Sequence, residues 1–245
     1  MEDIKTLYDI IFSDSKVVVI TGAGISTLSG IRDFDGENGI YKDLPNARYY
    51  MSRECLDKEP EKFYEFQKKY FLGKEYEPNI VHNVLAKLQE RGFIGTIITQ
   101  NIDGLHEKAG TTDLVNLHGN GNRFYCTGCK KEYTAEEYIE GYICKECGSV
   151  VRPDILLYGE WLNPKYYEKA MNAVKDADKL IVLGTGLWVE TVANLIINYM
   201  NTHPNMKNED IFVVNLGQVR FGRYVTHCNE DLGEIFKLVK KYEEQ

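Results

Sequence analysis

Short apolar runs alternate along this chain with longer segments in which apolar residues recur every three or four positions. Runs that are apolar throughout predict strands buried on both faces, and the longer spacing predicts amphipathic helices. The predicted strands span residues 16–21, 93–99, 114–117, 179–183 and 210–215. The predicted helices span residues 1–14, 54–71, 82–91 and 232–242. Because buried strands alternate with helices, the sequence predicts an α/β fold with a parallel sheet and helices on both of its faces.

Three of the predicted strands lead directly into loops that contain glycine. These loops begin at Gly22, Gly184 and Leu216. Ligands of open α/β sheets bind at this edge, and glycine lets backbone N–H groups approach phosphate and ribose oxygens closely. The first loop is not the standard dinucleotide fingerprint, because Gly30 follows Gly24 by six residues rather than three. A tight turn between strand and helix, with no ligand, stays an equal alternative for this loop.

An amide, a carboxylate and an imidazole follow two of the predicted strands. Asn101 and Asp103 come just after the second strand, and His118 comes just after the third. An imidazole can act as a general base near neutral pH, and the other two groups can orient a polar substrate. We therefore expect a catalytic group with His118 as its base. Asn101 or Asp103 could instead cap the next helix, and His106 is expected to orient the backbone there.

Four of the six cysteines form two Cys-x-x-Cys pairs, which are separated by 14 residues. Thiolates paired in this way are typical of structural zinc sites, in which four sulfurs complete a tetrahedron. Residues 122–149 are too few and too polar to bury a core, so zinc is expected to hold this module together. The predicted zinc ligands are Cys126, Cys129, Cys144 and Cys147.

The chain of 245 residues has a formal net charge of −8, which argues against a broad basic surface for nucleic acid. An acidic surface would instead attract basic peptides weakly. No stretch approaches the roughly 18 apolar residues of a membrane span, and the first residues lack the pattern of a signal peptide. We expect a cytoplasmic protein without nucleic-acid or membrane partners.

Several motifs taken together resemble those of the sirtuins, which are NAD-dependent protein-lysine deacylases. The motifs occur in order over about residues 17–217, nearly the whole chain. They are GAGIS (22–26), SGI (29–31), TQNIDGLH (99–106), HG (118–119), the four cysteines, VRP (151–153), GE (159–160) and GT (184–185). As a set, these motifs are highly specific for that family.

The resemblance implies a single catalytic domain, residues 1–245, with two lobes. The larger, Rossmann-like lobe would comprise residues 1–36, 80–121 and 150–245. The small lobe would consist of a helical insertion, residues 37–79, and the zinc module, residues 122–149. NAD would lie in the cleft between the lobes, with one structural Zn²⁺ in each chain. An acyl-lysine protein or peptide would enter from the opposite side.

The implied reaction transfers the acyl group of a lysine to ADP-ribose and releases nicotinamide. The acyl oxygen would attack C1′ of the nicotinamide ribose, and an alkylimidate would form. His118 would then act as general base on a ribose hydroxyl, while Asn101 would position the ribose and a water. Gln67 and Tyr70 stand where relatives selective for succinyl-like groups carry a Tyr and an Arg, so a neutral acyl group is expected.

The resemblance also implies which residues contact the two substrates. Among them, Ile102 and Asp103 would hold the nicotinamide amide, and Gln100 the ribose. Gly184, Thr185 and Asn215 would line the phosphates and the adenosine ribose, and Asp231 or Leu232 would lie near adenine. The residues expected to bind NAD are Gly22, Ala23, Gly24, Ser26, Thr27, Arg32, Phe34, Asp35, Gln100, Asn101, Ile102, Asp103, His118, Gly184, Thr185, Gly186, Asn215, Leu216, Gly217, Asp231 and Leu232. The residues expected to pair with the peptide, as an added strand, are Ile155, Leu156, Tyr158, Gly159 and Glu160.

Some positions depart from the family pattern. Arg32 and Asp35 replace the usual Pro and Arg, Gly186 replaces a common Ser, and Glu190-Thr191 stand where a Pro is common. A carboxylate at position 35 would repel the NAD diphosphate unless it turns away or Arg32 swings in. Two alternatives therefore stay open. One is a mono-ADP-ribosyltransferase or NAD hydrolase, and the other is a non-catalytic module that binds NAD or acyl-lysine.

Overall fold

A six-stranded parallel sheet forms the larger part of this computed structural model, which describes residues 2–32, 39, 42, 44 and 46–243. Its strands are β1 (Val17–Thr21), β2 (Ile97–Thr99), β3 (Leu114–Asn116), β7 (Lys179–Leu183), β8 (Ile211–Val214) and β9 (Thr226–Cys228). They lie in the order β3-β2-β1-β7-β8-β9, and every neighbouring pair is parallel. This is the strand order of Rossmann-type sheets, in which the winding reverses between β1 and β7.

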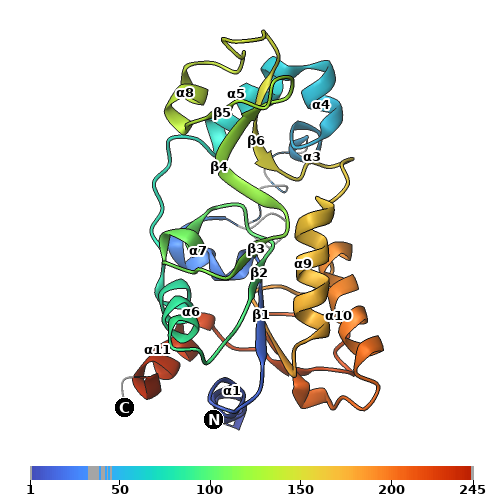
Figure 1. The fold of residues 1–245 in the computed structure, drawn as a ribbon. Helices are drawn as coiled ribbons and strands as arrows, with labels where there is room; N and C mark the ends of the chain where they lie inside the picture. Colours follow the sequence, from blue (N-terminus) through green and yellow to red (C-terminus); the bar gives the residue numbers. More distant parts are fainter. Residues whose placement is uncertain (1, 33–38, 40–41, 43, 45, 244–245) are drawn as a thin grey trace.

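Helices cover both faces of this sheet (Figure 1). One layer consists of α1 (Glu2–Ile11), α6 (Ile80–Glu90) and α11 (Leu232–Glu243), and the other of α9 (Pro164–Lys175) and α10 (Glu190–Thr202). Val17 and Val19 of β1 pack with the first layer, whereas Val18 and Ile20 pack with the second. Neighbouring residues of a strand point to opposite faces, so a strand covered on both sides must be apolar throughout. The predicted fold class is confirmed.

The strand β2 begins later than its apolar run predicts. The run starts at Phe93, but the strand starts at Ile97. The Phe93 N–H donates to Leu88 O at 2.9 Å and the Gly92 N–H donates to Gln89 O at 3.0 Å, so these residues close the end of α6. The predicted start of this strand is wrong because its first residues complete a helix cap. The other four predicted strands agree with the structure to within one residue at each end.

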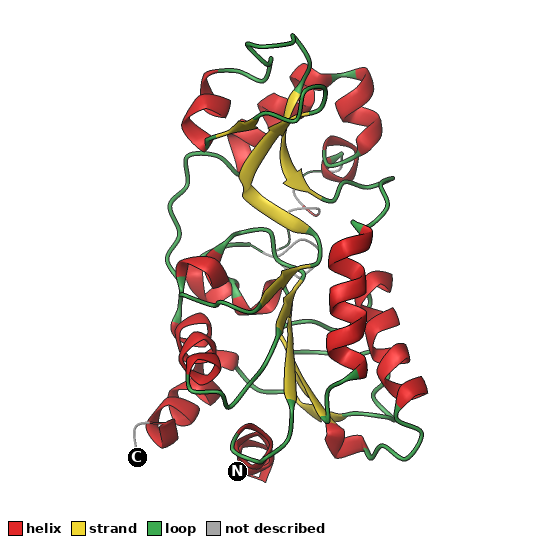
Figure 2. Cartoon of the chain, viewed as in Figure 1, coloured by secondary structure: helices red, strands yellow, loops and turns green. Residues whose placement is uncertain are grey.

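A second, smaller sheet and a group of helices form the small lobe at the top of Figure 2. Its strands β4 (Gly119–Cys126), β5 (Glu132–Tyr133) and β6 (Val151–Ile155) are antiparallel, in the order β5-β4-β6. The sequence-based boundaries assign part of β4 and all of β6 to the larger lobe, so the exact division stays a proposal. The helices here are α3 (Ala47–Tyr50), α4 (Arg53–Lys58), α5 (Pro60–Tyr70) and α8 (Ala135–Glu140). Short segments elsewhere are α7 (Leu105–Lys108), η1 (Ala23–Ile25), η2 (Thr27–Ser29) and η3 (Asn208–Asp210).

The cysteine-bearing module takes part in a small core of its own. Tyr138 of α8 is fully buried and stacks on Phe124 of β4, with ring centroids 4.6 Å apart. Tyr64 of α5 meets Tyr138 edge-on at 5.3 Å. Aromatic rings bury large apolar areas in such contacts. The expectation that this module buries no core is therefore wrong, because α5, which is distant in sequence, supplies part of that core.

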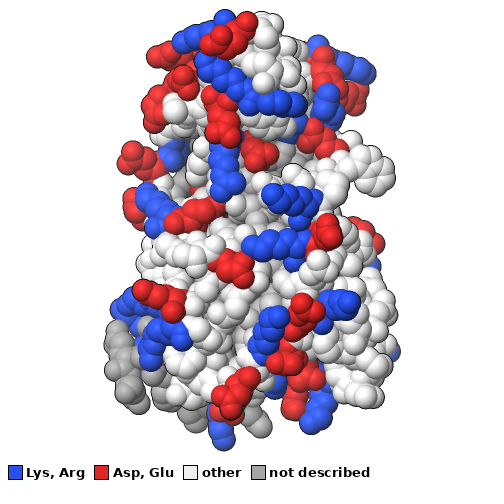
Figure 3. Space-filling view, viewed as in Figure 1, with Lys and Arg blue, Asp and Glu red and all other residues white. Residues whose placement is uncertain are grey.

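The surface carries charges of both signs. Lys and Arg side chains lie among Asp and Glu side chains over the face that Figure 3 shows. Some of them pair across elements, as Lys169 of α9 does with Asp113 at 2.7 Å. Among the residues that the structure describes, no helix has both the length and the apolar character needed to cross a bilayer.

Two buried histidines face each other between α6 and α7. The ring centroids of His82 and His106 lie 5.0 Å apart. Burial lowers the pKa of His82 to about 4. Burial, together with the neighbouring His82, lowers the pKa of His106 to about 3. Both rings are therefore neutral in the folded protein over a pH range in which an unfolded histidine takes up a proton.

This pair makes the free energy of unfolding depend on pH. A histidine whose pKa is lowered by folding costs no stability above its unfolded pKa of about 6.5, and about 1.4 kcal/mol per pH unit below it. We therefore expect stability to fall between about pH 6.5 and pH 5, measured by urea unfolding. His82→Leu is expected to reduce this slope by the share of one ring, while His106 and His118, whose pKa values burial also lowers, keep the rest. A slope that does not change in this variant would contradict the assignment.

Candidate functional site

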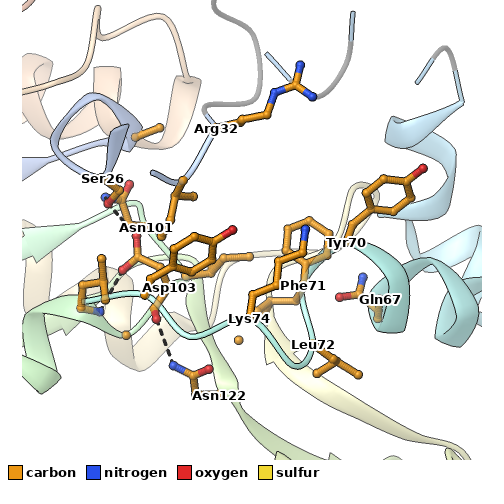
Figure 4. Close-up of a pocket in the computed structure, with 18 of the residues that line it drawn as sticks. Ser26, Arg32, Gln67, Tyr70, Phe71, Leu72, Lys74, Asn101, Asp103 and Asn122 are labelled. Carbon is orange, nitrogen blue, oxygen red and sulfur yellow. Dashed lines mark hydrogen bonds between the residues drawn. The ribbon is translucent and has the colours of Figure 1, made fainter. Parts of the chain in front are cut away.

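A cavity of 630 Å³ lies between the carboxyl edge of the large sheet and the small lobe. Open α/β sheets bind ligands at this edge, and the volume is typical of a small-molecule site. The predicted site residues in its wall are Ala23, Ser26, Arg32, Asn101, Ile102, Asp103 and Ile155 (Figure 4). The small-lobe side of the wall includes Gln67, Tyr70, Phe71 and Lys74.

A chain of hydrogen bonds joins three side chains of this wall. Asn101 Nδ2 donates to Gly22 O at 3.1 Å and to Ser26 Oγ at 3.0 Å. Ser26 Oγ donates in turn to Asp103 Oδ2 at 2.7 Å. Both amide hydrogens of Asn101 are used in these bonds, so its Oδ1 is the polar atom left for a ligand. Asn101 is therefore fixed as a hydrogen-bond acceptor at the cavity.

Asp103 is largely enclosed by protein. Burial raises the pKa of its carboxyl group above the usual value, while hydrogen bonds from the Leu105 N–H and Ser26 oppose that shift. The bond from Leu105, 2.9 Å long, ties Asp103 to the first turn of α7. The predicted capping role and the predicted ligand role are therefore compatible, because the remaining lone pairs of the carboxyl group can accept a hydrogen bond from an amide NH₂.

His118 follows β3 and is held at both ring nitrogens. Its Nδ1 lies 3.1 Å from Gln100 O, and its Nε2 lies 2.9 Å from Thr191 Oγ1. A carbonyl oxygen only accepts, so Nδ1 carries the hydrogen of the neutral ring and Nε2 is unprotonated. Burial lowers the pKa of His118 below its usual value, although the Gln100 carbonyl opposes the shift. A neutral imidazole with an unprotonated Nε2 has the properties of a general base.

The structure does not bring every predicted residue to the cavity. Neither His118 nor Gln100 lines the cavity itself. His118 bonds to Gln100 O, and Gln100 directly precedes the wall residue Asn101. His106 is buried and contacts Thr21 Oγ1 at 2.9 Å, as expected for a residue that orients the backbone. Arg32 lines the cavity and donates to Gly39 O at 3.3 Å. Phe34 and Asp35 lie outside the described residues.

The glycine-rich loops differ from the expectation in one respect. The N–H groups of Gly22, Gly24 and Gly184 donate to Leu183 O, Gly184 O and Val214 O, each at 2.9 Å. These three amides are engaged inside the protein, so the contact of these loops with phosphate stays a prediction that rests on their other atoms. A Cβ on Gly24 would lie 2.7 Å from the Cα of Gly184. Glycine is needed here because the loops after β1 and β7 touch each other.

One buried donor fits a nucleotide at this edge. Gln100 Nε2 has no hydrogen-bond partner among the described residues, although its surroundings exclude water. A Cβ added to Gly22 would meet this atom at 3.0 Å, so the amide group faces the loop after β1. An unpaired buried donor costs roughly 1–3 kcal/mol, and a ligand oxygen that accepts its hydrogen removes that cost. Gln100 thus suits the ribose contact implied for NAD.

The residues expected near adenosine lie after β8 and before α11. Asn215 O accepts from His227 Nε2 at 2.9 Å, which fixes the end of β8. Asp231 Oδ1 accepts from the Glu234 N–H at 3.0 Å, so Asp231 caps the start of α11. Their contacts with NAD stay a prediction. Exposed Leu216 and Gly217 also follow β8, and buried Leu232 begins α11. The other expected residues, Thr27 and Thr185, lie after β1 and β7.

The segment expected to bind the peptide is tied to the helical insertion. The Tyr158 N–H donates to Met51 O at 3.0 Å, and Tyr158 O accepts from the Arg53 N–H at 2.9 Å. The Leu156 N–H donates to His118 O at 2.8 Å. The backbone of Tyr158 is therefore already paired, and its half-exposed side chain is what a peptide can meet. Contact of the peptide with Ile155, Leu156, Gly159 and Glu160 stays a prediction.

A buried ion pair fixes the same segment. Arg152 is 3% exposed and donates to both carboxylate oxygens of Glu160 and to Ile155 O. Glu160 also accepts from the Leu157 N–H at 3.0 Å. Burial acts to raise the pKa of Glu160, but the hydrogen bond and the charge of Arg152 outweigh it and hold the pKa below its usual value. The Glu160 carboxylate therefore orders this turn from within.

The four predicted zinc ligands converge in the small lobe. Their Sγ atoms all lie within 4.8 Å of one another. Cys126 Sγ and Cys147 Sγ are 3.4 Å apart, and Cys129 Sγ and Cys144 Sγ are 3.6 Å apart. Four sulfurs about 2.3 Å from a tetrahedral zinc lie about 3.8 Å from one another. The cluster therefore fits a structural zinc ion whose four positions are all filled by thiolates.

Comparison with known proteins agrees with this geometry. The model described as the Sir2 family matches residues 22–191. The chain belongs to the Sir2 family. It is 39% identical over 242 residues to an NAD-dependent protein deacetylase of Staphylococcus aureus, and the match covers 96% of this chain and 97% of that relative. It is 40% identical over 220 residues to a protein of the same description from Listeria monocytogenes, with 90% and 93% covered.

Solved Sir2 structures are similar over nearly the whole chain. One is a histidine-to-alanine variant of Sir2 with deacetylated p53 peptide and 3′-O-acetyl ADP-ribose. It has a TM-score of 0.89 and 36% identity, and the match covers 98% of both chains. A Sir2 complex with p53 peptide and NAD⁺ has a TM-score of 0.86 and 34% identity, again over 98% of both chains.

One departure of this chain from the Sir2-family pattern has a steric reason. A Cβ on Gly186 would lie 2.8 Å from two ring atoms of Trp188 and 3.0 Å from Gln218 O. A serine at this position therefore has no room while Trp188 keeps its place. The glycine and the tryptophan form a matched pair in this chain.

Gly186→Ser is accordingly expected to weaken NAD binding rather than to restore a family contact. Overpacking typically costs 1–3 kcal/mol, so we expect the Kd of NAD in calorimetry to rise about tenfold. Gly141→Ser is a control, because a Cβ there meets nothing within 4 Å. Removing the large ring in Gly186→Ser/Trp188→Ala should recover part of the loss. Tighter NAD binding by Gly186→Ser would contradict this steric account.

Two functional residues are not identified by the sequence pattern. In the sequence, Thr191 stands out only because Glu190-Thr191 occur where the family commonly has a Pro. In the structure, its hydroxyl contacts the ring of His118. Arg152 belongs to the VRP motif, but the sequence gives no sign that it pairs with Glu160. Both contacts join segments that are brought together by the Sir2 fold.

Proposed function

We propose that this chain is an NAD-dependent protein-lysine deacetylase, which transfers the acyl group of a lysine to ADP-ribose and releases nicotinamide. The observation that carries the proposal is the neutral His118, with an unprotonated Nε2, next to the chain of hydrogen bonds from Asn101 through Ser26 to Asp103. The deacetylases of Staphylococcus aureus and Listeria monocytogenes, and the Sir2 complex with acetyl ADP-ribose, support the same activity here.

The side chains of the site have separate roles in this reaction. NAD, when bound, supplies the ribose carbon that the acyl oxygen attacks and the nicotinamide that leaves. His118 Nε2 takes the proton of a ribose hydroxyl, since it is the ring nitrogen without a hydrogen. Asn101 offers Oδ1 to the ribose or to a water, because both of its amide hydrogens are donated elsewhere. Asp103 accepts a hydrogen bond from the nicotinamide amide, with Ile102 beside it in the cavity wall.

Fewer observations bear on which acyl group the protein prefers and on where in the cell it acts. Gln67 and Tyr70 stand at the two positions that select the acyl group in relatives, and neither offers a cation to an acidic acyl group. Cations of this wall, such as Arg32 and Lys74, lie at other positions. A neutral group such as acetyl therefore fits better than succinyl. A cytoplasmic location is supported by the four thiols of the zinc cluster, which must stay reduced to bind the metal.

The direct test follows all products in one reaction. Incubation with NAD and an acetyl-lysine peptide should give equal amounts of nicotinamide, deacetylated peptide and acetyl ADP-ribose, measured by mass spectrometry. Omission of either substrate should give none of them. Nicotinamide and ADP-ribose without peptide would instead indicate an NAD hydrolase, and ADP-ribose attached to protein would indicate a transferase. NAD binding without turnover over acetyl, propionyl and succinyl peptides would indicate a binding module. Each of these three outcomes contradicts the proposal.

A further inference from the structure

The hydroxyl of Thr191 is the second anchor of the base. Thr191 lies in the first turn of α10, 73 residues after His118, and its Oγ1 is 2.9 Å from Nε2. Nδ1 of the ring is already committed to Gln100 O at 3.1 Å. The hydrogen of this contact must therefore come from the threonine when the ring is neutral. The proline common at this position in the family has no hydroxyl to give.

We propose that Thr191 is a positioning residue for His118, a role that rests on the proposed function. Its hydroxyl first donates to Nε2 and so holds the neutral ring in the tautomer needed for a base. Because Nε2 has a single lone pair, the threonine hydrogen must turn away before the ribose hydroxyl can deliver its proton to that lone pair. Once Nε2 carries the proton, the oxygen of the same threonine accepts a hydrogen bond from Nε2–H. A threonine hydroxyl can do both because it has one hydrogen and two lone pairs.

The sign of the effect follows from the strength of the two bonds. A hydrogen bond with an ionised partner is about twice as strong as one between neutral groups. The Thr191 hydroxyl therefore stabilises the imidazolium more than the neutral ring. An interaction that is stronger after proton transfer than before it lowers the barrier of that step. Removing the hydroxyl is expected to weaken His118 as a base and to slow the step that uses it.

Other charges around the ring do not override this argument. The charged groups on the surrounding elements are Asp103 after β2, Arg123 in β4, Arg152 and Asp154 in β6, and Glu190 in α10. Arg152 pairs with Glu160 and Arg123 with Glu107. Glu190 pairs with Arg220 at 2.7 Å, and Asp103 accepts from Ser26. The two groups that bond to the His118 ring are both neutral. The hydroxyl is therefore the polar side chain in direct contact with the basic nitrogen.

The test compares three variants on the same helix. Thr191→Val keeps the shape but loses the hydroxyl, Thr191→Ser keeps the hydroxyl, and Thr202→Val removes a hydroxyl that bonds only near the far end of α10. Imidazole ¹⁵N NMR of the ligand-free protein should show His118 with the hydrogen on Nδ1 in the wild type. Its pKa should fall by about 0.7 unit in Thr191→Val and stay within about 0.2 unit in the other two.

Kinetics supply the second readout. The kcat of acyl-ADP-ribose formation should fall about fivefold in Thr191→Val, with KM for NAD and peptide unchanged, and Thr191→Ser should recover it. An unchanged or raised pKa of His118 in Thr191→Val would overturn the proposal. A fall in kcat that is equal in Thr191→Val and Thr191→Ser would also overturn it. The NMR result stands without turnover, so failure of the proposed deacetylase activity and failure of this inference are distinguishable.

Discussion

Replacement of His118 by Ala is expected to reduce the formation of acetyl ADP-ribose by a factor of about 10²–10⁴, the usual contribution of a general base. The ring supplies the unprotonated Nε2, and no other histidine among the described residues lies next to the Asn101–Ser26–Asp103 chain. His106 is buried against Thr21, and His82 packs against His106. The product is measured by mass spectrometry at saturating NAD and peptide.

The same variant separates base catalysis from folding and binding. His118→Ala loses the two hydrogen bonds of the ring, so we expect its urea midpoint to fall modestly while the protein stays folded. The Kd of NAD should change little. His203→Ala, at the end of α10, is the matched control and should keep full activity. Formation of acetyl ADP-ribose by His118→Ala at more than a tenth of the wild-type rate would contradict the assignment of the base.

Loss of one zinc ligand is expected to have the largest effect on the structure. Zinc contributes roughly 10–16 kcal/mol in small zinc-binding peptides, far more than a small lobe gains from its few buried rings. Cys129→Ser, or treatment with a chelator, should remove the metal and open the small lobe. The change should reach the active site, because β4 runs from Gly119, next to His118, to the zinc ligand Cys126. It pairs there with β6, which leads into the segment held by Arg152.

Zinc content and hydrogen exchange measure this effect. The wild type should contain one zinc per chain, and Cys129→Ser should contain none and lose amide protection over residues 119–155. Deacetylation should fall with it. Cys228→Ser is the control, since Cys228 is a thiol outside the cluster, buried in β9 of the large sheet, whereas Cys129 is exposed. A Cys129→Ser protein that keeps its zinc and its protection would contradict the four-thiolate site.

The strand predictions that the structure confirms rest on the local pattern of apolar residues. In the run at residues 179–183, the four residues after Lys179 are apolar and pack against one helix layer or the other. The run therefore predicts a strand with the bounds of β7. The run at 93–99 fails at its start, because apolar Phe93 serves a helix cap that hydrophobicity does not distinguish from a strand. The strand β9 was not predicted, because three residues that include Thr226 and His227 show no apolar run.

At the site, too, local sequence patterns predicted some features, and contacts between distant segments decided others. The two Cys-x-x-Cys pairs predict the zinc cluster, because each pair places two thiols on one turn whatever surrounds it. The motifs around Asn101 and His118 place an amide and an imidazole at strand ends, which the parallel sheet then brings to one edge. The glycines, in contrast, do not leave their amides free. Gly22 bonds to Leu183 at the end of β7 and Gly24 to Gly184 in the loop after it, about 160 residues further along the chain.

The sequence by itself determined the fold class and the zinc ligands and predicted the base, because strand periodicity, ligand spacing and motif order depend on neighbouring residues. Only the tertiary structure decided how these groups act. It placed Thr191 on His118 Nε2, the carboxylate of Glu160 on buried Arg152, and Trp188 over Gly186. The first contact joins segments 73 residues apart, and the other two depend on the path of the chain within one turn, which no residue pattern specified. A hydrogen bond needs its two atoms within about 3 Å, and sequence spacing does not set distances between segments far apart in the chain.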